Sequence, residues 1–419
     1  MFEVLTNQTM LGKRKADAEA GTVGGLPAAG GAAGGARAGA GEGGGGGGNA
    51  AGLHRSHLLS VKQFDLAKAA ALLANAERMK QLVQTHGGDE RLKHRVLASV
   101  FYEPSTRTSC SFQAAMLRLG GSVVSVNPDH SSVQKGESLE DTVQTMACYC
   151  DAIVLRHPVK GSAQQAADAS PNCPIINAGD GVGEHPTPAL LDLFTIQTEL
   201  GRIGHYLAPV ASPSTATAAT ATATAATATV ATASATATAS AATATGTTAA
   251  SPPTHTPPPV MTVTLVGDLK HGRTVHSLVR LLALFPGLRL VYVAPDSLAM
   301  PQDVIDELRA TAPALEQVVG SGRSLQDAIA ETDVLYVTRV QKERFASEDE
   351  YKAVAGSYCV DAALLARAKA AGSMIVMHPL PRLQEIATEV DADPRAAYFR
   401  QMQNGMFVRM AILDATLRG

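Results

Sequence analysis

The chain has 419 residues, enough for two or three domains of ordinary size, and its 45% apolar content allows a sizeable core. A net charge of -3 and an isoelectric point near 6.5 argue against a general surface for nucleic acid or anionic membrane. No apolar run approaches the roughly 20 residues that cross a bilayer. Five cysteines, three of them inside apolar elements, lack zinc-type spacing. We therefore expect reduced core cysteines in an intracellular protein without membrane span or metal.

Two stretches of biased composition interrupt the chain. Residues 1–52 form a Gly/Ala tract, and residues 205–259 contain a Thr/Ala repeat followed by prolines. Neither offers an apolar face that could offset the entropy of ordering, so both are predicted to be disordered. The basic triplet Lys13–Lys15 is either a targeting signal or part of a solvated tail. Few arginines and no serine precede Leu53, which favours the cytoplasm, with a plastid as the alternative.

The stretch Arg95–Gly121 carries the clearest local pattern. Val96–Tyr102 is a short apolar run typical of a buried parallel strand. After the loop Glu103-Pro104, a helix is predicted to begin at Ser105–Thr108 and to end at Gly120-Gly121. Free N–H groups and the dipole at this helix start, with two threonine hydroxyls and a guanidinium, would form a phosphate cradle. The alternative is an ordinary N-cap with a surface arginine.

The other predicted elements alternate between helices and strands. In the first half they are helix Phe64–Gln84, strand Ser122–Val126, helix Leu139–Tyr149, strands Ala152–Leu155 and Ile175–Asn177, and helix Ala189–Leu200. In the second half they are strand Thr262–Val266, helix Thr274–Leu284, strands Leu288–Val293, Val334–Thr338 and Met374–Met377, and a last helix from Arg395 to about Leu417. Asp393 and Pro394 are predicted as N-cap and first residue of that helix. This alternation predicts an α/β fold of two doubly wound domains with mostly parallel sheets.

Cationic or imidazole side chains follow the ends of apolar strands in both halves. They are Arg107, Arg156, His185, Arg273, Arg339 and His378. Because ligands of open parallel sheets bind at the carboxyl ends of the strands, we expect a cleft between the two domains for one or two anionic ligands. The alternative is a set of surface salt bridges. Gly179–Gly183 has the pattern Gly-x-Gly-x-Gly, not the dinucleotide fingerprint, and is predicted to be a turn beside a small ligand.

A series of motifs resembles the aspartate carbamoyltransferases, of the aspartate/ornithine carbamoyltransferase superfamily. The motifs are FYEPSTRTS, SSVQKGES, VLRHP, NAGDGVGEHPT, VGDLKHGRTVHSL, TRVQKERF, MHPLPR and DPRAAYFRQ. The similarity runs from about Leu53 to Leu417, apart from the Thr/Ala insertion. It implies a carbamoyl-phosphate-binding domain at residues 53–204, an aspartate-binding domain at 260–394, and a C-terminal helix at 395–419 that packs on the first domain.

The resemblance also implies a role for each matching residue. Those that would hold the phosphate are Ser105, Thr106, Arg107 and Thr108, and those that would address the carbamoyl oxygen are Thr108, Arg156 and His185. Aspartate would be bound by Arg273, Arg339, Gln341 and the backbone of Leu380, beside a cis Leu380–Pro381 bond. Ser131, for carbamoyl phosphate, and Lys135, for aspartate and catalysis, lie on a loop that would reach a neighbouring subunit in a homotrimer. Glu103 would pair with Arg273 and Arg344 as the domains close.

The implied reaction transfers the carbamoyl group of carbamoyl phosphate to the amino group of L-aspartate, in pyrimidine biosynthesis, and needs no cofactor. Both substrates carry negative charge, and arginine suits planar contacts to phosphate and carboxylate. Attack by the amine creates an oxyanion that preorganised donors would stabilise.

One position departs from the family pattern. The family has His-Pro-Thr-Gln where this chain has His185-Pro186-Thr187-Pro188, and the glutamine normally helps to bind the carbamoyl group. Two alternatives stay open: an ornithine carbamoyltransferase, which shares the fold and the phosphate motif, and, because of Pro188, a weakened or non-catalytic paralogue. Arg339 with Gln341 favours an amino acid with a second carboxylate over ornithine.

Overall fold

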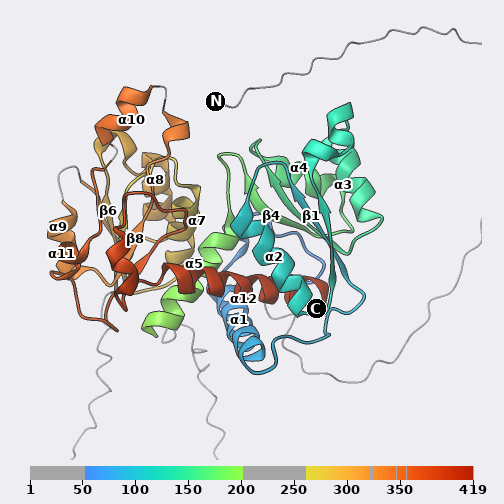
Figure 1. Cartoon of the computed structure of the whole chain (residues 1–419), viewed down its shortest axis with the longest axis horizontal. Coiled ribbons are helices and arrows are strands. Elements are labelled where there is room, and N and C mark those ends of the chain that lie inside the picture. Colours follow the sequence, from blue (N-terminus) through green and yellow to red (C-terminus); the bar gives the residue numbers. More distant parts are fainter. Residues whose placement is uncertain (1–51, 202–260, 321–323, 346, 355, 419) are drawn as a thin grey trace, which may run out of the picture. The chain divides into compact units, whose positions relative to one another are not determined.

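Two sheets, one from each half of the chain, form the framework of the protein (Figure 1). The structure is a computed structural model that describes residues 52–201, 261–320, 324–345, 347–354 and 356–418. The predicted tail, apart from Gly52, and the predicted insertion at 205–259 therefore lie outside the described residues. We call residues 52–201 the first lobe and the described residues between 261 and 393 the second lobe.

The sheet of the first lobe has the strand order β2-β1-β3-β4, and each neighbouring pair is parallel. Its strands are β1 (Val96–Phe101), β2 (Ser122–Val126), β3 (Ala152–His157) and β4 (Ile175–Asp180). The strands β1, β3 and β4 are buried along most of their length, whereas the edge strand β2 is half exposed. Continuous apolar strands are the expected result of helices covering both faces of a parallel sheet.

The sheet of the second lobe has the order β7-β6-β5-β8-β9 and is also parallel throughout its described strands. Its strands are β5 (Met261–Val266), β6 (Leu288–Val293), β7 (Glu316–Val318), β8 (Val334–Val337) and β9 (Ile375–Met377). Sequence patterns missed β7, because its three residues are too few for an alternating pattern. The two parallel sheets confirm the predicted α/β class.

Helices connect the strands within each lobe. In the first lobe they are α1 (Leu66–His86), α2 (Thr106–Arg118), α3 (Leu139–Ala147), α4 (Ser162–Ala169) and α5 (Pro186–Leu200). In the second lobe they are α7 (Arg273–Leu282), α8 (Gln302–Thr311), α9 (Leu325–Ala328), α10 (Glu348–Val354) and α11 (Ala362–Leu365).

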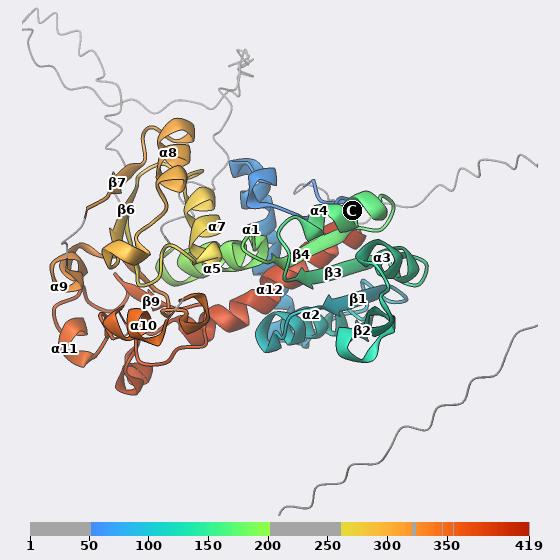
Figure 2. The ribbon, with the colours of Figure 1, turned by 90° about the horizontal axis from the view of Figure 1, so that it is seen from above.

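Two helices join the lobes. Helix α12 (Tyr398–Leu417) leaves the second lobe and packs against α1, α2 and α5, and α5 packs against α7 (Figure 2). One cluster of buried apolar side chains runs through these helices and includes Phe112, Phe194, Leu278 and Phe407. The two lobes therefore share a core that passes through α5 and α12.

The predicted start of the last helix is wrong. Helix α12 begins at Tyr398 with Ala397 as N-cap, and Asp393 accepts hydrogen bonds from Arg395 instead of capping a helix. Residues 395–397 lie beside β9, where the Val376 N–H donates to the Arg395 carbonyl at 2.8 Å and the Ala397 N–H donates to the Val376 carbonyl at 2.9 Å. Pairing with the sheet therefore outcompetes the local Asp-Pro helix signal, because it satisfies the backbone of β9.

The cysteines are only partly where composition placed them. All five are free, but only Cys150 and Cys173 are buried, whereas Cys110, Cys148 and Cys359 are exposed. An apolar segment can expose one of its faces, so segment composition was a poor guide to burial here. Among the described residues, no helix combines the length and apolar character needed to cross a membrane.

A buried polar network crosses the shared core. The Asp192 carboxylate accepts from the Tyr336 hydroxyl at 2.8 Å and from the Gln401 amide at 2.6 Å. The Gln401 amide oxygen in turn accepts from the His378 N–H at 3.0 Å. Burial raises the pKa of Asp192 to about 7, against the opposing effect of its two hydrogen bonds. This network ties α5, α12, β8 and the end of β9 together.

Tyr336→Phe is expected to destabilise the fold by about 1–3 kcal/mol, because it leaves a buried carboxylate oxygen without its donor. The folded-state pKa of Asp192 is raised, so its contribution to stability is full below the unfolded pKa near 4 and is lost as pH rises through about 7. The variant should therefore lose more stability at pH 8, where the carboxylate is ionised, than at pH 6. Urea unfolding of both proteins at the two pH values measures this, and equal stability at pH 8 would contradict it.

Candidate active site

A cavity of about 520 Å³ lies where the carboxyl ends of strands from both sheets meet. The six side chains singled out after strand ends all line it: Arg107, Arg156, His185, Arg273, Arg339 and His378. They come from both lobes, so residues far apart in the sequence surround one space. Among the described residues, no group of three or more His, Cys, Asp or Glu could hold a metal ion.

The first turn of α2 forms one wall of the cavity. Ser105 is the N-cap residue in extended conformation, and Thr106, Arg107 and Thr108 follow it along the cavity. The leading N–H groups of a helix have no acceptor within the helix, and its dipole favours an anion there. Burial, and then the charges of Arg156 and Arg339, lower the pKa of Arg107. An anionic ligand would relieve this crowding of positive charge.

His185, at the start of α5, is buried and neutral. Burial, reinforced by Arg156, Arg273 and Arg409, holds the pKa of His185 well below its usual value. Its Nδ1 atom is buried and has no hydrogen-bond partner among the described residues. A neutral imidazole of this kind can donate a hydrogen bond to a ligand but cannot serve as a proton store near neutral pH.

His185→Gln is expected to make stability less sensitive to acid. The folded-state pKa of His185 is lowered, so its contribution is present above the unfolded pKa of about 6.5 and is lost as pH falls. At pH 5.5 the wild type should lose on the order of 1 kcal/mol of stability through this group, which the glutamine variant keeps. Urea unfolding of both proteins at pH 7.5 and 5.5 measures the difference, and parallel losses would exclude the effect.

Glu103 joins two of the arginines. Its carboxylate lies 3.1 Å from Arg156 Nε and 3.8 Å from Arg273 Nη2. The expected pair with Arg273 is therefore present, and a pair with Arg156 was not anticipated. Arg344 is exposed, and within the described residues no ion pair links it to Glu103, so their pairing on domain closure stays a prediction. The Glu103 carboxylate therefore pairs with Arg156 in its own lobe and with Arg273 at the start of α7 in the second lobe.

The residues that the motifs propose for binding the substrate aspartate lie on the second-lobe side of the cavity. Arg273, Arg339, Gln341 and Leu380 all line it. Leu380 precedes a cis peptide bond to Pro381, as the resemblance implied, and has φ 52°. The Leu380 N–H donates to His378 Nδ1 at 2.8 Å, and His378 Nε2 faces Glu385 at 2.9 Å. His378 is fully buried and thereby anchors the loop that carries Leu380.

The structure does not bring every predicted residue to the cavity. Ser131 caps a short turn and donates to the Pro128 carbonyl at 3.1 Å, while Lys135 is exposed at the end of that turn. Neither side chain lines the cavity of its own chain, and Arg344 does not either. The expectation for Ser131 and Lys135 was a site in a neighbouring subunit, so their position outside this cavity is compatible with it.

Sequence patterns missed the floor of the cavity. It contains Ser111 of α2, Asp192 of α5, and Gln401 and Arg409 of α12. The one local signal was Arg409, a charged residue inside the apolar run from Met406 to Leu413. Its contact with residues of α2 depends on how α12 packs, which no local pattern reports.

The turn Gly179–Gly183 contacts Arg273, one of the residues that line the cavity. Gly179 and Gly181 have φ of 116° and 57°, and a Cβ on Gly181 would lie 2.2 Å from the Pro158 carbonyl oxygen. Only glycine fits such a position. The Gly181 carbonyl accepts a hydrogen bond from Arg273, so the turn positions that guanidinium. The predicted turn is therefore present, and a small ligand beside it stays a prediction.

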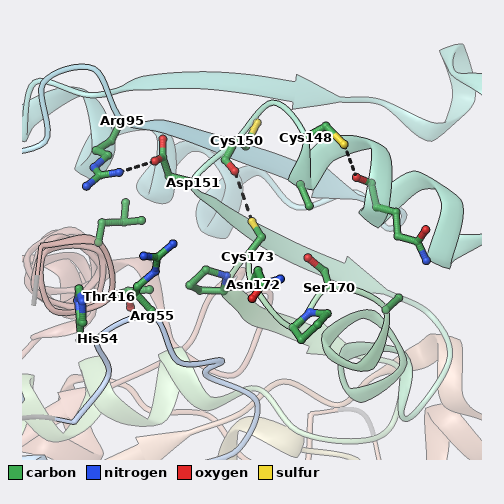
Figure 3. A pocket seen from close by; sticks show the side chains of 16 residues that line it. His54, Arg55, Arg95, Cys148, Cys150, Asp151, Ser170, Asn172, Cys173 and Thr416 are labelled. Atoms are coloured by element: carbon green, nitrogen blue, oxygen red, sulfur yellow. Dashed lines mark hydrogen bonds and ion pairs between the residues drawn. The ribbon is translucent and has the colours of Figure 1, made fainter. Parts of the chain in front are cut away.

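A second cavity, of about 450 Å³, opens at the opposite ends of the first-lobe strands, where β1, β3 and β4 begin (Figure 3). Figure 3 shows the ion pair between Arg95 and Asp151, and the hydrogen bond that the Cys173 thiol donates to the Cys150 carbonyl oxygen. Burial raises the pKa of Cys150 and raises that of Cys173 to about 12, so neither thiol is an activated nucleophile. Helices α3, α4 and α12 end at this cavity, and helix C-termini disfavour anions. This second cavity therefore does not share the anion-binding character of the first cavity.

Family models match both lobes. The carbamoyl-P binding domain of aspartate/ornithine carbamoyltransferase matches residues 56–198, and the Asp/Orn binding domain matches residues 260–416.

Individual relatives agree with these matches. The multifunctional protein pyr1-3 of Dictyostelium discoideum is 47% identical over 85% of the chain, which spans only 13% of that relative. The aspartate carbamoyltransferase catalytic subunit of Methanopyrus kandleri is 39% identical over 86% of the chain and 97% of the subunit. The crystal structure of Trypanosoma cruzi aspartate transcarbamoylase with carbamoyl phosphate has a TM-score of 0.71 and 38% identity, covering 88% of this chain and 98% of the other. On these matches, the chain belongs to the aspartate/ornithine carbamoyltransferase family.

Proposed function

We propose that the chain transfers the carbamoyl group of carbamoyl phosphate to the amino group of L-aspartate, giving N-carbamoyl-L-aspartate and phosphate in pyrimidine biosynthesis. The observation that carries the proposal is that cationic side chains from both lobes line one and the same cavity. Carbamoyl phosphate brings about two negative charges and aspartate brings two carboxylates. The T. cruzi relative has been crystallised with carbamoyl phosphate and aspartate, and with N-(phosphonacetyl)-L-aspartic acid.

The first lobe would bind and polarise carbamoyl phosphate. The start of α2 would hold the phosphate through backbone N–H groups, hydroxyls and Arg107. Thr108, Arg156 and His185 would donate hydrogen bonds to the carbamoyl oxygen. The neutral amine of aspartate attacks the carbamoyl carbon, negative charge builds on that oxygen, and phosphate leaves as the nitrogen releases a proton. Donors already in place stabilise this charge without reorganising, and holding both substrates together lowers the entropic part of the barrier.

The second lobe would select the amino acid. Arg273 and Arg339 line that side of the cavity, and arginine pairs readily with carboxylates. Ornithine would place an ammonium group among these cations, which like-charge repulsion disfavours. Aspartate, with a second carboxylate, is therefore the better fit.

A homotrimer with shared sites would explain the position of Ser131 and Lys135. A cavity of about 360 Å³ opens between the ends of β1 and β2, next to Glu103 and Ser105. This opening beside the phosphate cradle offers an entry for a loop from another subunit. We propose that the loop containing Ser131 and Lys135 enters the neighbour's site in this way.

An assay for carbamoyl aspartate with the purified chain tests the proposal. Carbamoyl aspartate should form, and phosphate should be released in equal amount, only when L-aspartate is present. Phosphate release that depends on ornithine instead would overturn the choice of substrate. Binding of carbamoyl phosphate without turnover of either amino acid would indicate the non-catalytic paralogue that Pro188 suggests.

A further inference from the structure

The loop after β9 brings Leu380 to the active-site cavity, and a buried imidazole holds that loop. The Leu380 N–H donates to His378 Nδ1 at 2.8 Å, so this ring nitrogen is unprotonated. The ring proton of a neutral imidazole then lies on Nε2, which is 2.9 Å from Glu385 Oε1. Burial, against the opposing effect of Glu385, lowers the pKa of His378, and nearby guanidinium groups lower it further. His378 is therefore a neutral ring that accepts from Leu380 and donates to Glu385.

Glu385 also holds the other end of the same loop. Its Oε1 atom accepts a second hydrogen bond, from the Leu383 N–H at 3.1 Å. Burial alone would raise the pKa of Glu385, but hydrogen bonds from His378 and from backbone N–H groups lower it, so the carboxylate is ionised and can only accept. One carboxylate oxygen therefore joins the two ends of the segment from His378 to Leu383.

The backbone that this segment presents to the cavity has an uncommon conformation. Leu380 has φ 52°, in the left-handed region that residues with a side chain seldom adopt. Such a conformation persists only where surrounding contacts hold it. Because the Leu380 N–H is committed to His378, its carbonyl is the backbone group that remains for a ligand. A carbonyl only accepts, and the amino group is the hydrogen-bond donor of the substrate aspartate.

Glu385 itself lies outside the active-site cavity. It lines a different cavity, of about 330 Å³, together with Leu383. The start of the loop has a separate anchor, since the His378 N–H donates to the Gln401 amide oxygen at 3.0 Å. Loss of the Glu385 carboxylate would therefore leave the loop attached to α12 but release the imidazole ring and the Leu383 end.

We propose that Glu385 is a positioning residue for the amino-acid substrate, and that through His378 it holds the Leu380 carbonyl where it meets the amino group of aspartate. This contact would orient the nitrogen lone pair toward the carbamoyl carbon, as attack requires. Carbamoyl phosphate, bound by the first lobe, would not depend on Glu385. The inference rests on the proposed function, because it names a residue that serves the same site.

Removal of the acceptor at Glu385 tests this role. Glu385→Leu should lower kcat/KM for aspartate at least about tenfold, because a small displacement of a reacting group is costly. Calorimetry with carbamoyl phosphate alone should give binding within about twofold of wild type. Glu385→Gln keeps the one oxygen that accepts both hydrogen bonds, and should restore kcat/KM to within about threefold of wild type. A loss in the glutamine variant as large as in the leucine variant would overturn the proposal.

Glu389→Leu is the matched control. Glu389 accepts from the Ala362 N–H at 2.9 Å in the same lobe and does not line the active-site cavity. Its kcat/KM for aspartate should stay within about twofold of wild type. A fall as large as that of Glu385→Leu would assign the effect to the stability of the lobe and overturn the proposal.

Thermal unfolding of each variant shows whether it is folded. If Glu385→Leu does not fold, Glu385→Asp keeps the charge and draws the carboxylate back by one methylene. The aspartate variant should still raise KM for the substrate aspartate at least about threefold. An unchanged KM in it would overturn the proposal.

A double-mutant cycle with His378 tests whether Glu385 acts through the imidazole. His378→Asn keeps an acceptor near the position of Nδ1 but is too short to reach Glu385. Adding Glu385→Leu to this variant should lower kcat/KM for aspartate by less than about threefold more. Losses that multiply would show that Glu385 acts independently of His378, and would overturn the proposal.

Binding of an analogue separates this inference from the proposed function. N-(phosphonacetyl)-L-aspartic acid, with which the T. cruzi relative was crystallised, should bind Glu385→Leu at least about fivefold more weakly than wild type. If the wild type made no carbamoyl aspartate, the proposed function would fail, while weaker analogue binding by the variant would still support the positioning role. Equal binding together with equal turnover would overturn the role of Glu385 and leave the proposed function intact.

Discussion

Lys135→Ala is expected to abolish carbamoyl transfer while leaving the chain folded. Lys135 is exposed at the end of the turn Ser132–Lys135 and outside the cavity of its own chain. Removing an exposed side chain of this kind changes stability by about 0.5 kcal/mol or less. In the proposed trimer, however, the partner subunit's Lys135 completes the site and its ammonium group meets the anionic substrates. Activity should fall to about 1% or less, a loss of about 2.7 kcal/mol or more in transition-state stabilisation. The carbamoyl-aspartate assay and thermal unfolding measure the two effects.

Mixing two inactive variants tests whether the site is shared. In a closed ring of three subunits that contains both variants, one interface joins an Arg156 from a Lys135→Ala chain to a Lys135 from an Arg156→Met chain. Each mixed trimer therefore has one active site in which both residues are native. Random exchange of equal amounts should therefore restore about a quarter of wild-type activity. A lysine that acted within its own chain would give no recovery. Lys93→Ala, which removes an exposed lysine paired with Glu90 at 2.8 Å, should remain fully active.

Arg156→Met is expected to lower kcat by roughly a hundredfold to a thousandfold, the usual cost of losing one oxyanion donor. Arg156 lines the cavity at the end of β3 and is held by Glu103 at 3.1 Å. The substitution also leaves the Glu103 carboxylate without its closest partner, which adds repulsion toward carbamoyl phosphate. The KM for carbamoyl phosphate should therefore rise as well. Steady-state kinetics with both substrates varied measures the two parameters.

Two variants show whether this loss belongs to the site. Arg156→Lys should recover little activity, because one ammonium cannot hold Glu103 and a substrate oxygen in the planar geometry of a guanidinium. Arg289→Met removes a strand arginine of the second lobe, which pairs with Glu316 at 2.9 Å and Glu331 at 2.7 Å away from the cavity. Its kcat should stay close to wild type. A similar fall in both arginine-to-methionine variants would point to lost stability and not to a lost donor.

Local patterns were most successful where the signal is carried by neighbouring residues. Strand β6 has the predicted bounds, and β1 and β5 differ from prediction by one residue at one end. Buried parallel strands are short apolar runs bounded by turn residues, so their sequence alone marks them. The polar residues of the site were predicted because they directly follow these strands. The ends of parallel strands lie at the same side of a sheet, so residues that follow them come close together. Helix starts were less accurate, because α5 begins at Pro186 and α12 at Tyr398, positions set by contacts with other segments.

Amino-acid order by itself determined that this protein has two parallel sheets and a cationic site where their strands end, since those properties depend on short-range patterns of apolar and charged residues. Only the tertiary structure decided which groups meet there. It paired Glu103 with Arg156, set Asp192 between Tyr336 and Gln401, and buried Arg409 beside Ser111. Burial of a charge depends on the segments packed around it, and α12 reaches the first lobe from the far end of the chain. Packing across such distances creates the electrostatics of the site, and no local pattern contains it.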